Sequence, residues 1–571
     1  MWKIFLKNSS NLLTRKQKSI FSAALIIMVM VTISRILGLI RNRILAHFFT
    51  AEALSIYFAA FRIPEVVFEV LIFGTLSSAF IPTFTAYLSK KREEEAWYIV
   101  SAVISLVLVF FLLLAIPLFI LSKPLYQIIT PGFSLPDVGL TAKLAQILLL
   151  AQGFFILSYF LTAILESFQR FLVPALAPLF YNLGIILGTV VFARRLGIYG
   201  PTIGAVIGAF FHFLIQVPLA FHLGFRPRLF LDINHPGVKK IGRLALPRVI
   251  ELSFLQISKG AELFLASLVS TAAYTYYTFA NSLQLLPVTL FGTSIAKAAL
   301  PSLSYQTAGG NTKDFKKTFF FLFNQIVLLT FPLSVFLAVL RLPLVRLVFG
   351  AAQFTWGSTL QTGLTLSAFC PGITAQALIY LLTRAFYALH NTKTPVITSV
   401  GAMLLNIVFG AFFILILRLP IWSLALAFSL ASVIQVILLL GFLRKKINFS
   451  LRDLSLFLLK VAFCSFTSGG VMFFFLKVLD RSAWDKRLSF LGWLGLVLPV
   501  SFNYFVLDTR YTVNLIYLTF IVGLIGLVVY LGLIKILKIP GFRVFTRLLL
   551  NFGRKRKSSF SNLNHNDVVG S

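Results

Sequence analysis

Long apolar runs separated by short polar stretches extend along almost the whole chain. A helix of about 20 apolar residues covers the roughly 30 Å hydrocarbon core of a bilayer, and the runs reach that length. Because the apolar positions are continuous and do not alternate, they predict transmembrane helices and not the strands of a barrel. We count about fourteen such segments. The predicted spans are residues 21–47, 54–86, 97–121, 142–164, 172–193, 199–223, 245–268, 272–304, 317–340, 361–383, 395–417, 420–442, 453–478 and 512–534.

The composition excludes an ordinary soluble protein. Of 571 residues, 58% are hydrophobic and only 12% are charged, which indicates a polytopic membrane protein. The formal charge of +34 comes from Lys and Arg spread over the loops between the predicted spans. There they determine topology and contact anionic membrane lipids, so nucleic acid is not an expected partner. Cys370 and Cys464 lie in apolar segments without a CxxC motif, so we expect core residues and not a disulfide or a zinc site.

Basic residues also predict the topology. The segment 1–20 carries five lysines and arginines, which by the positive-inside rule keep this end in the cytoplasm. An even number of spans then places both termini there, together with most of the basic loops. Arg194-Arg195 falls outside, so the rule holds only as a bias. The apolar segment 486–508 is expected to be an interfacial or re-entrant insertion before the last span.

The chain also carries traces of an internal duplication. The triplet Phe-Gly-Thr occurs at 73–75 and again at 291–293, an offset of 218 residues, and Pro174 and Pro395 are 221 residues apart. The similar offsets predict two homologous six-helix lobes, which is how many alternating-access transporters are built. The predicted divisions are a basic N-terminus (1–20), an N-lobe (21–225), a linker (226–243), a C-lobe (244–445), C-terminal helices with an inserted segment 480–511 (446–540), and a basic, disordered tail (541–571).

Arginines lie within the first predicted span. Arg35, Gly38 and Arg41 are three residues apart, so they form a slanted strip on one side of a helix. A cation at the bilayer centre costs about 2.5–3.5 kcal/mol on insertion scales, so intramembrane arginines usually face a wet cavity, a partner or an anionic ligand. The alternative is that Arg41 and Arg43 extend to the headgroup layer at the helix end.

Further charges lie in the second and seventh spans. Arg62, Glu65 and Glu69 share one helical face, because they are three and four residues apart. These charges either neutralise one another where helices meet, or the arginines of the first two spans outnumber the glutamates and leave a net positive charge. An excess suits a phosphate or pyrophosphate, which Arg binds with paired donors. No P-loop, GxSxG or metal-ligand motif occurs, so the chain is not expected to be an enzyme. The seventh span carries Arg248, Glu251, Lys259 and Glu262.

Motifs spread over residues 20 to 450 form a recognisable combination. They are Ser34-Arg35-Ile36-Leu37-Gly38-Leu39-Ile40-Arg41, Phe58-Ala59-Ala60-Phe61-Arg62-Ile63-Pro64, Ala79-Phe80-Ile81-Pro82, Phe168 to Pro178 with Asn182, Leu300 to Ser304, and Phe386 to Pro395. Together these motifs resemble the MurJ (MviN) family of lipid II flippases.

The resemblance implies a transporter of about fourteen helices, from the multidrug/oligosaccharidyl-lipid/polysaccharide superfamily, in the bacterial cytoplasmic membrane. It implies movement of lipid II, the undecaprenyl-pyrophosphate-linked peptidoglycan precursor, from the inner to the outer leaflet by alternating access. Cell-wall synthesis machinery is a further implied partner. In that family two additional C-terminal helices form a groove for the lipid tail, which here would be spans 453–478 and 512–534.

The sequence departs from the family pattern at several charged positions. Asn42 and Ser55 stand where the family usually has aspartates, and Phe68 and Phe73 replace an arginine and a glutamate. The central Asp-Arg pair of the eighth helix aligns with Asn281-Ser282. The resemblance therefore leaves open how the headgroup is bound. Arg248 or Lys259 would be the residues to compensate for the missing charges. The expected substrate-binding residues are Ser34, Arg35, Arg41, Asn42, Arg62, Arg248 and Lys259.

The resemblance implies no cofactor other than a sodium ion. Some members of the family carry a sodium site in the C-terminal half, and Glu262 and Asn406 fall at matching positions. Gly410 stands where another acidic ligand would be expected.

Other functions stay open at this point. A related transporter would move another polyprenyl-linked oligosaccharide or a small cationic compound, although a cation exporter should show unpaired carboxylates in the N-terminal half. A non-transporting scaffold of cell-wall assembly would not need a wet, charged interior.

Overall fold

The computed structural model describes residues 20–75, 79–481 and 506–539. The predicted basic N-terminus, the tail and most of the inserted segment 480–511 lie outside these residues. In the described residues all regular secondary structure is helical, apart from one isolated β-bridge between Asp480 and Leu507. Twelve of the described helices are long and apolar enough to cross a membrane. The predicted all-α membrane fold is therefore confirmed.

The helices agree closely with the predicted spans. α2 and the consecutive helices α3 to α5 occupy the first two spans, and the twelve further candidate spans correspond to the other predictions. The helices are α2 (Ile20–Phe48), α3 (Ala51–Ala60), α4 (Arg62–Thr75), α5 (Ile81–Ser89), α6 (Glu93–Ile120), α7 (Ser122–Ile129), α8 (Leu135–Ser167), α9 (Leu172–Leu196), α10 (Tyr199–Leu214), α11 (Val217–His222), α12 (Pro236–Val269), α13 (Ala273–Pro287), η2 (Val288–Thr293), α14 (Ser294–Ala308), α15 (Thr312–Val339), α16 (Arg341–Phe349), α17 (Trp356–Ala388), α18 (Lys393–Ala411), η3 (Phe412–Ile416), α19 (Trp422–Ile447), α20 (Leu451–Leu479) and α23 (Thr512–Ile536).

Local sequence explains where several helices begin. The hydroxyl of Ser134 accepts a hydrogen bond from the backbone N–H of Asp137 at the start of α8, and Ser450 does the same with Asp453 at the start of α20. Both are Ser-x-x-Asp sequences. The serine hydroxyl accepts a hydrogen bond from a backbone N–H of the first helical turn, and the aspartate carboxylate lies near the positive end of the helix dipole.

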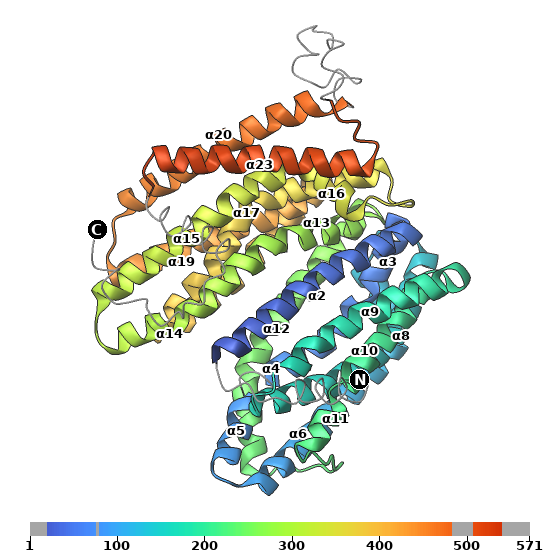
Figure 1. The fold of residues 1–571 in the computed structure, drawn as a ribbon. Coiled ribbons are helices and arrows are strands. Elements are labelled where there is room, and N and C mark those ends of the chain that lie inside the picture. The colour runs from blue at the N-terminus through green and yellow to red at the C-terminus, as the bar shows by residue number, and fades with distance from the viewer. Residues whose placement is uncertain (1–19, 76–78, 482–505, 540–571) are drawn as a thin grey trace, which may run out of the picture. The chain divides into compact units, whose positions relative to one another are not determined.

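The chain divides into two compact units. The first comprises Met1–Leu286, Leu340–Ile379 and Asn391–Phe442, and contains every residue predicted to bind substrate or sodium. In this unit α8, α9 and α10 lie side by side (Figure 1). A Cβ atom added at Gly204 of α10 would lie only 2.5 Å from the carbonyl oxygen of Gly184 in α9, so these helices pack backbone against backbone.

The second unit comprises Pro287–Val339, Tyr380–His390 and Leu443–Ser571. In it α20 and α23, orange and red in Figure 1, lie against each other, and α20 also packs on α15. The Ser468 hydroxyl donates to the Gly526 carbonyl at 2.6 Å, and the Tyr530 hydroxyl donates to the Leu328 carbonyl at 2.8 Å. These helices match the predicted C-terminal pair, while the lipid-tail groove and the lobe boundaries stay predictions.

Candidate functional site

The first unit encloses a cavity of about 430 Å³ between α2, α3, α4, α9 and α13. Its volume is within the range of about 300–1,000 Å³ typical of small-molecule sites. The structure brings five predicted residues to this one cavity: Ser34, Arg35, Arg41, Asn42 and Arg62.

α2 places four of these residues on the cavity wall. Because α2 continues from Ile20 to Phe48, Arg41 is not at the end of the helix, and it faces the cavity together with Arg35 and Gly38. The predicted strip with a spacing of three residues is therefore present. Arg43 is not part of the cavity wall, and its guanidinium donates to the backbone carbonyl of Leu347 in α16.

Two asparagine side chains hold Arg41. Its Nε and Nη2 donate to Oδ1 of Asn42 at 3.2 and 3.0 Å, and its Nη1 donates to Oδ1 of Asn182 in α9 at 3.1 Å. The Asn182 amide in turn donates to the Pro178 carbonyl and to the Ser34 hydroxyl, at 3.1 and 3.4 Å. Both asparagines are neutral, and among the described residues no carboxylate pairs with Arg41. Its positive charge therefore remains available to an anion.

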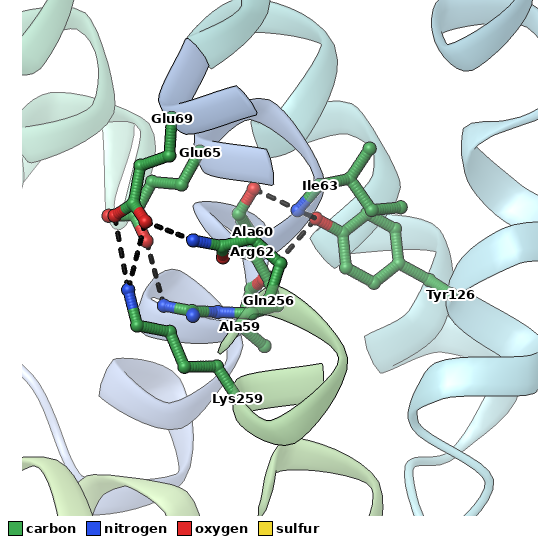
Figure 2. A network of polar contacts seen from close by, with 9 residues as sticks. All are labelled: Ala59, Ala60, Arg62, Ile63, Glu65, Glu69, Tyr126, Gln256 and Lys259. Carbon is green, nitrogen blue, oxygen red and sulfur yellow. Dashed lines mark hydrogen bonds and ion pairs between the residues drawn. The ribbon is translucent and has the colours of Figure 1, made fainter. Parts of the chain in front are cut away.

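A helix break positions Arg62. Pro64 has no N–H, so the Ala60 carbonyl lacks its usual donor four residues ahead, and α3 ends at Ala60. The buried Tyr126 hydroxyl of α7 donates to this carbonyl at 2.8 Å (Figure 2). α4 begins directly afterwards at Arg62. The proline and the distant tyrosine together determine where the backbone of Arg62 lies.

Arg62 is largely enclosed and forms an ion pair on the cavity wall. Its side chain is only 12% exposed, and its Nη2 donates to Oε2 of Glu65 at 2.7 Å. Its Nε and Nη1 are buried, and no described residue accepts a hydrogen bond from them. Buried donors without partners are costly unless water or a ligand satisfies them. Three arginines against the single carboxylate of Glu65 leave the described cavity wall with two excess positive charges.

Part of the cavity wall is aromatic, which was not predicted from the sequence. Tyr57, Tyr181 and Tyr274 line the cavity, and the buried Tyr57 hydroxyl has no hydrogen-bond partner among the described residues. A signal was present in α13, where Tyr274, Thr278 and Asn281 recur at helical spacing on one face. Asn281 and its neighbour Ser282, noted only as departures from the family pattern, also line the cavity.

The two remaining predicted cations lie elsewhere. Lys259 of α12 is not on the cavity wall, and its Nζ lies 3.1 and 3.2 Å from the two carboxylate oxygens of Glu69. Arg248 also belongs to α12, but its side chain is outside the described part of the structure. Substrate contact by either residue stays a prediction.

The predicted sodium ligands lie close together in the first unit. The Asn406 amide of α18 donates to Oε1 of Glu262 at 3.2 Å, while Asn406 Oδ1 is buried and accepts no hydrogen bond from a described residue. A Cβ atom at Gly410 would lie 2.9 Å from Leu424 and 3.0 Å from Leu265, so leucines fill the place of the expected acidic ligand. Glu262 and Asn406 alone do not complete the roughly six oxygens typical of hard cations. Sodium binding stays a prediction.

Comparison with known proteins agrees with this fold. The family described as "Lipid II flippase MurJ" matches residues 44–495. The probable lipid II flippase MurJ of Buchnera aphidicola subsp. Acyrthosiphon pisum is 28% identical over 418 residues, covering 72% of this chain and 81% of that protein. That of Borreliella burgdorferi is 25% identical over 501 residues, covering 86% and 96%.

Solved structures show the same likeness. The structure "Lipid II flippase MurJ, inward closed conformation" matches 92% of this chain and all of its own chain, with a TM-score of 0.72 and 25% identity. An inward-facing multidrug resistance MATE transporter of the MOP superfamily matches 74% of this chain with a TM-score of 0.62 and 13% identity, which shows the fold alone. The chain thus belongs to the MurJ family of lipid II flippases, as a multi-pass membrane protein.

Proposed function

We propose that this chain is a transporter that moves lipid II from the inner to the outer leaflet of the bacterial cytoplasmic membrane for cell-wall synthesis. The observation that carries the proposal is the cavity whose described wall has two excess positive charges, in a multi-pass member of the MurJ family. An undecaprenyl pyrophosphate diester has about two negative charges, so a cavity of this charge suits its headgroup.

The mechanism follows from the roles of the cavity residues. Arg35 and Arg41 on α2, with Arg62 on α4, bind the pyrophosphate oxygens through charge-assisted hydrogen bonds. Asn42 and Ser34 keep the Arg41 guanidinium in place, Asn42 directly and Ser34 through an asparagine of α9. The binding strength then depends on fixed donors in a low-dielectric site, and alternating access exposes that site to one leaflet at a time. Both termini lie in the cytoplasm, and partners from the cell-wall synthesis machinery receive the product.

A depletion strain tests the function. Removal of this protein should cause lipid-linked precursor to accumulate on the cytoplasmic leaflet, measured by the access of an externally added sugar-modifying enzyme to the precursor headgroup. Accumulation of a different polyprenyl-linked oligosaccharide would favour a related flippase. A non-transporting scaffold would restore growth even with Arg35 and Arg41 both replaced by alanine.

The membrane potential is expected to favour export. Moving two negative charges toward a positive exterior gains about 2 × 2.3 kcal/mol per 100 mV when the charges cross the whole field. Collapsing the potential with an ionophore, at constant ion gradients, should therefore slow flipping in proteoliposomes. An unchanged flipping rate would contradict this prediction.

A further inference from the structure

A second set of polar side chains joins α4 to α12 next to the cavity (Figure 2). The Lys259 ammonium of α12 contacts both carboxylate oxygens of Glu69 in α4, at 3.1 and 3.2 Å, and the Gln256 amide also donates to this carboxylate. The Lys259 side chain is 31% exposed and that of Glu69 is 20% exposed, so water solvates this ion pair only in part.

Helical spacing explains why these groups meet. Glu65 and Glu69 are one turn apart on α4, and Gln256 and Lys259 are three residues apart on α12, so each pair shares a face of its helix. α4 and α12 pack against each other. Figure 2 shows the two glutamate carboxylates on the same side of α4, one contacting Arg62 and the other contacting Lys259.

The pairing separates two carboxylates that would otherwise act on the same arginine. Glu65 pairs with Arg62, which lines the cavity, whereas Glu69 is held by donors from α12 and is not on the cavity wall. Without Lys259, Glu69 would carry an uncompensated negative charge about one turn from Glu65. Such a charge in a region of low dielectric would repel an anion at the cavity and compete for Arg62.

We propose that Lys259 is a positioning residue of the substrate site and not a substrate ligand. It neutralises Glu69 and joins α4 to α12, so that Arg62 keeps its ion pair with Glu65 and two further buried donors for an anionic lipid headgroup. The inference rests on the proposed function, because it assumes a pyrophosphate in the cavity. In this proposal Lys259 affects binding indirectly, through Glu69, and does not contact the substrate. Direct contact and the indirect effect predict opposite results for a variant in which Lys259 and Glu69 are both replaced by neutral residues.

The test is the affinity of the full-length protein in lipid nanodiscs for undecaprenyl pyrophosphate, measured by intrinsic fluorescence. Lys259→Met should weaken binding about tenfold or more, because it exposes the Glu69 charge, and Lys259→Arg should restore most of the affinity. The double variant Lys259→Met with Glu69→Gln should bind within about threefold of the wild type. Lys316 is only partly exposed and contacts a backbone carbonyl in the second unit, so it provides a control: Lys316→Met should bind as the wild type.

Each outcome has a definite meaning. If the double variant binds as weakly as Lys259→Met, then Lys259 contacts the substrate directly and the positioning role is wrong. The double variant is a neutral pair, so it decides the question even where Lys259→Met is too unstable to purify. Absence of binding by the wild type would overturn the proposed function and this inference with it. If the wild type and Lys316→Met bind undecaprenyl pyrophosphate but the double variant does not, the positioning role of Lys259 is wrong and the proposed function stands.

Discussion

Arg41→Ala should weaken binding of the lipid-linked pyrophosphate about ten- to hundredfold and abolish growth of a flippase-depleted strain. The substitution removes a charge-assisted contact with the substrate, which the arginine fork can make bidentate and which is worth about 1.5–3 kcal/mol. Arg41→Lys should rescue only part of the loss, because an ammonium lacks the planar fork. Complementation at matched membrane expression and binding in nanodiscs measure the effect.

Two controls separate binding from folding. Arg41→Gln keeps a side chain that can hydrogen-bond Asn42 and Asn182 but has no charge, so it should preserve thermal stability and still lose affinity. Arg194→Ala removes an exposed charge at the end of α9 and should change little. Full growth with Arg41→Ala would show that this arginine only anchors the helix.

The positions of the membrane helices could be predicted because their signal is local. A continuous apolar run indicates a span by itself, and the predicted span 453–478 differs from α20 (Leu451–Leu479) by only one or two residues at each end. The predicted span 54–86 was less accurate, because the structure divides this region into α3, α4 and α5. Its break depends on Pro64, which the sequence displays, and on Tyr126, which is distant in sequence and supplies the missing donor.

Helical spacing could predict which cavity residues share a face of one helix, but nothing more about the cavity. The three-residue spacing of Arg35, Gly38 and Arg41 placed all three on one side of α2, and the structure shows that they face the cavity. Spacing along one helix does not identify partners on another helix. The contact between Lys259 and Glu69, and the amide contacts of Arg41, depend on how separate helices pack. Tyr57 and Tyr181 were missed because aromatic residues are common throughout this chain and give no distinct signal by themselves. Tyr274 was recognisable only by its helical spacing with Thr278 and Asn281.

Arg62→Met should have the largest effect on substrate binding, a loss of more than about hundredfold. It removes the cation with free buried donors, and it leaves the Glu65 carboxylate without its partner on the cavity wall. The lost contact accounts for about 1.5–3 kcal/mol, and repulsion between the exposed carboxylate and the pyrophosphate adds to it. Binding in nanodiscs and complementation measure the loss.

A double variant separates these two contributions. Arg62→Met with Glu65→Gln removes the repulsion but not the lost contact, so binding should recover about tenfold without reaching the wild-type affinity. Arg92 pairs with Glu95 at the same spacing of three residues, but both side chains are substantially exposed, so Arg92→Met is the matched control and should leave binding unchanged. Complete recovery in the double variant would mean that Arg62 serves only to neutralise Glu65. In that case the pyrophosphate would be bound by the arginines of α2 alone, and the buried donors of Arg62 would need a partner other than the substrate.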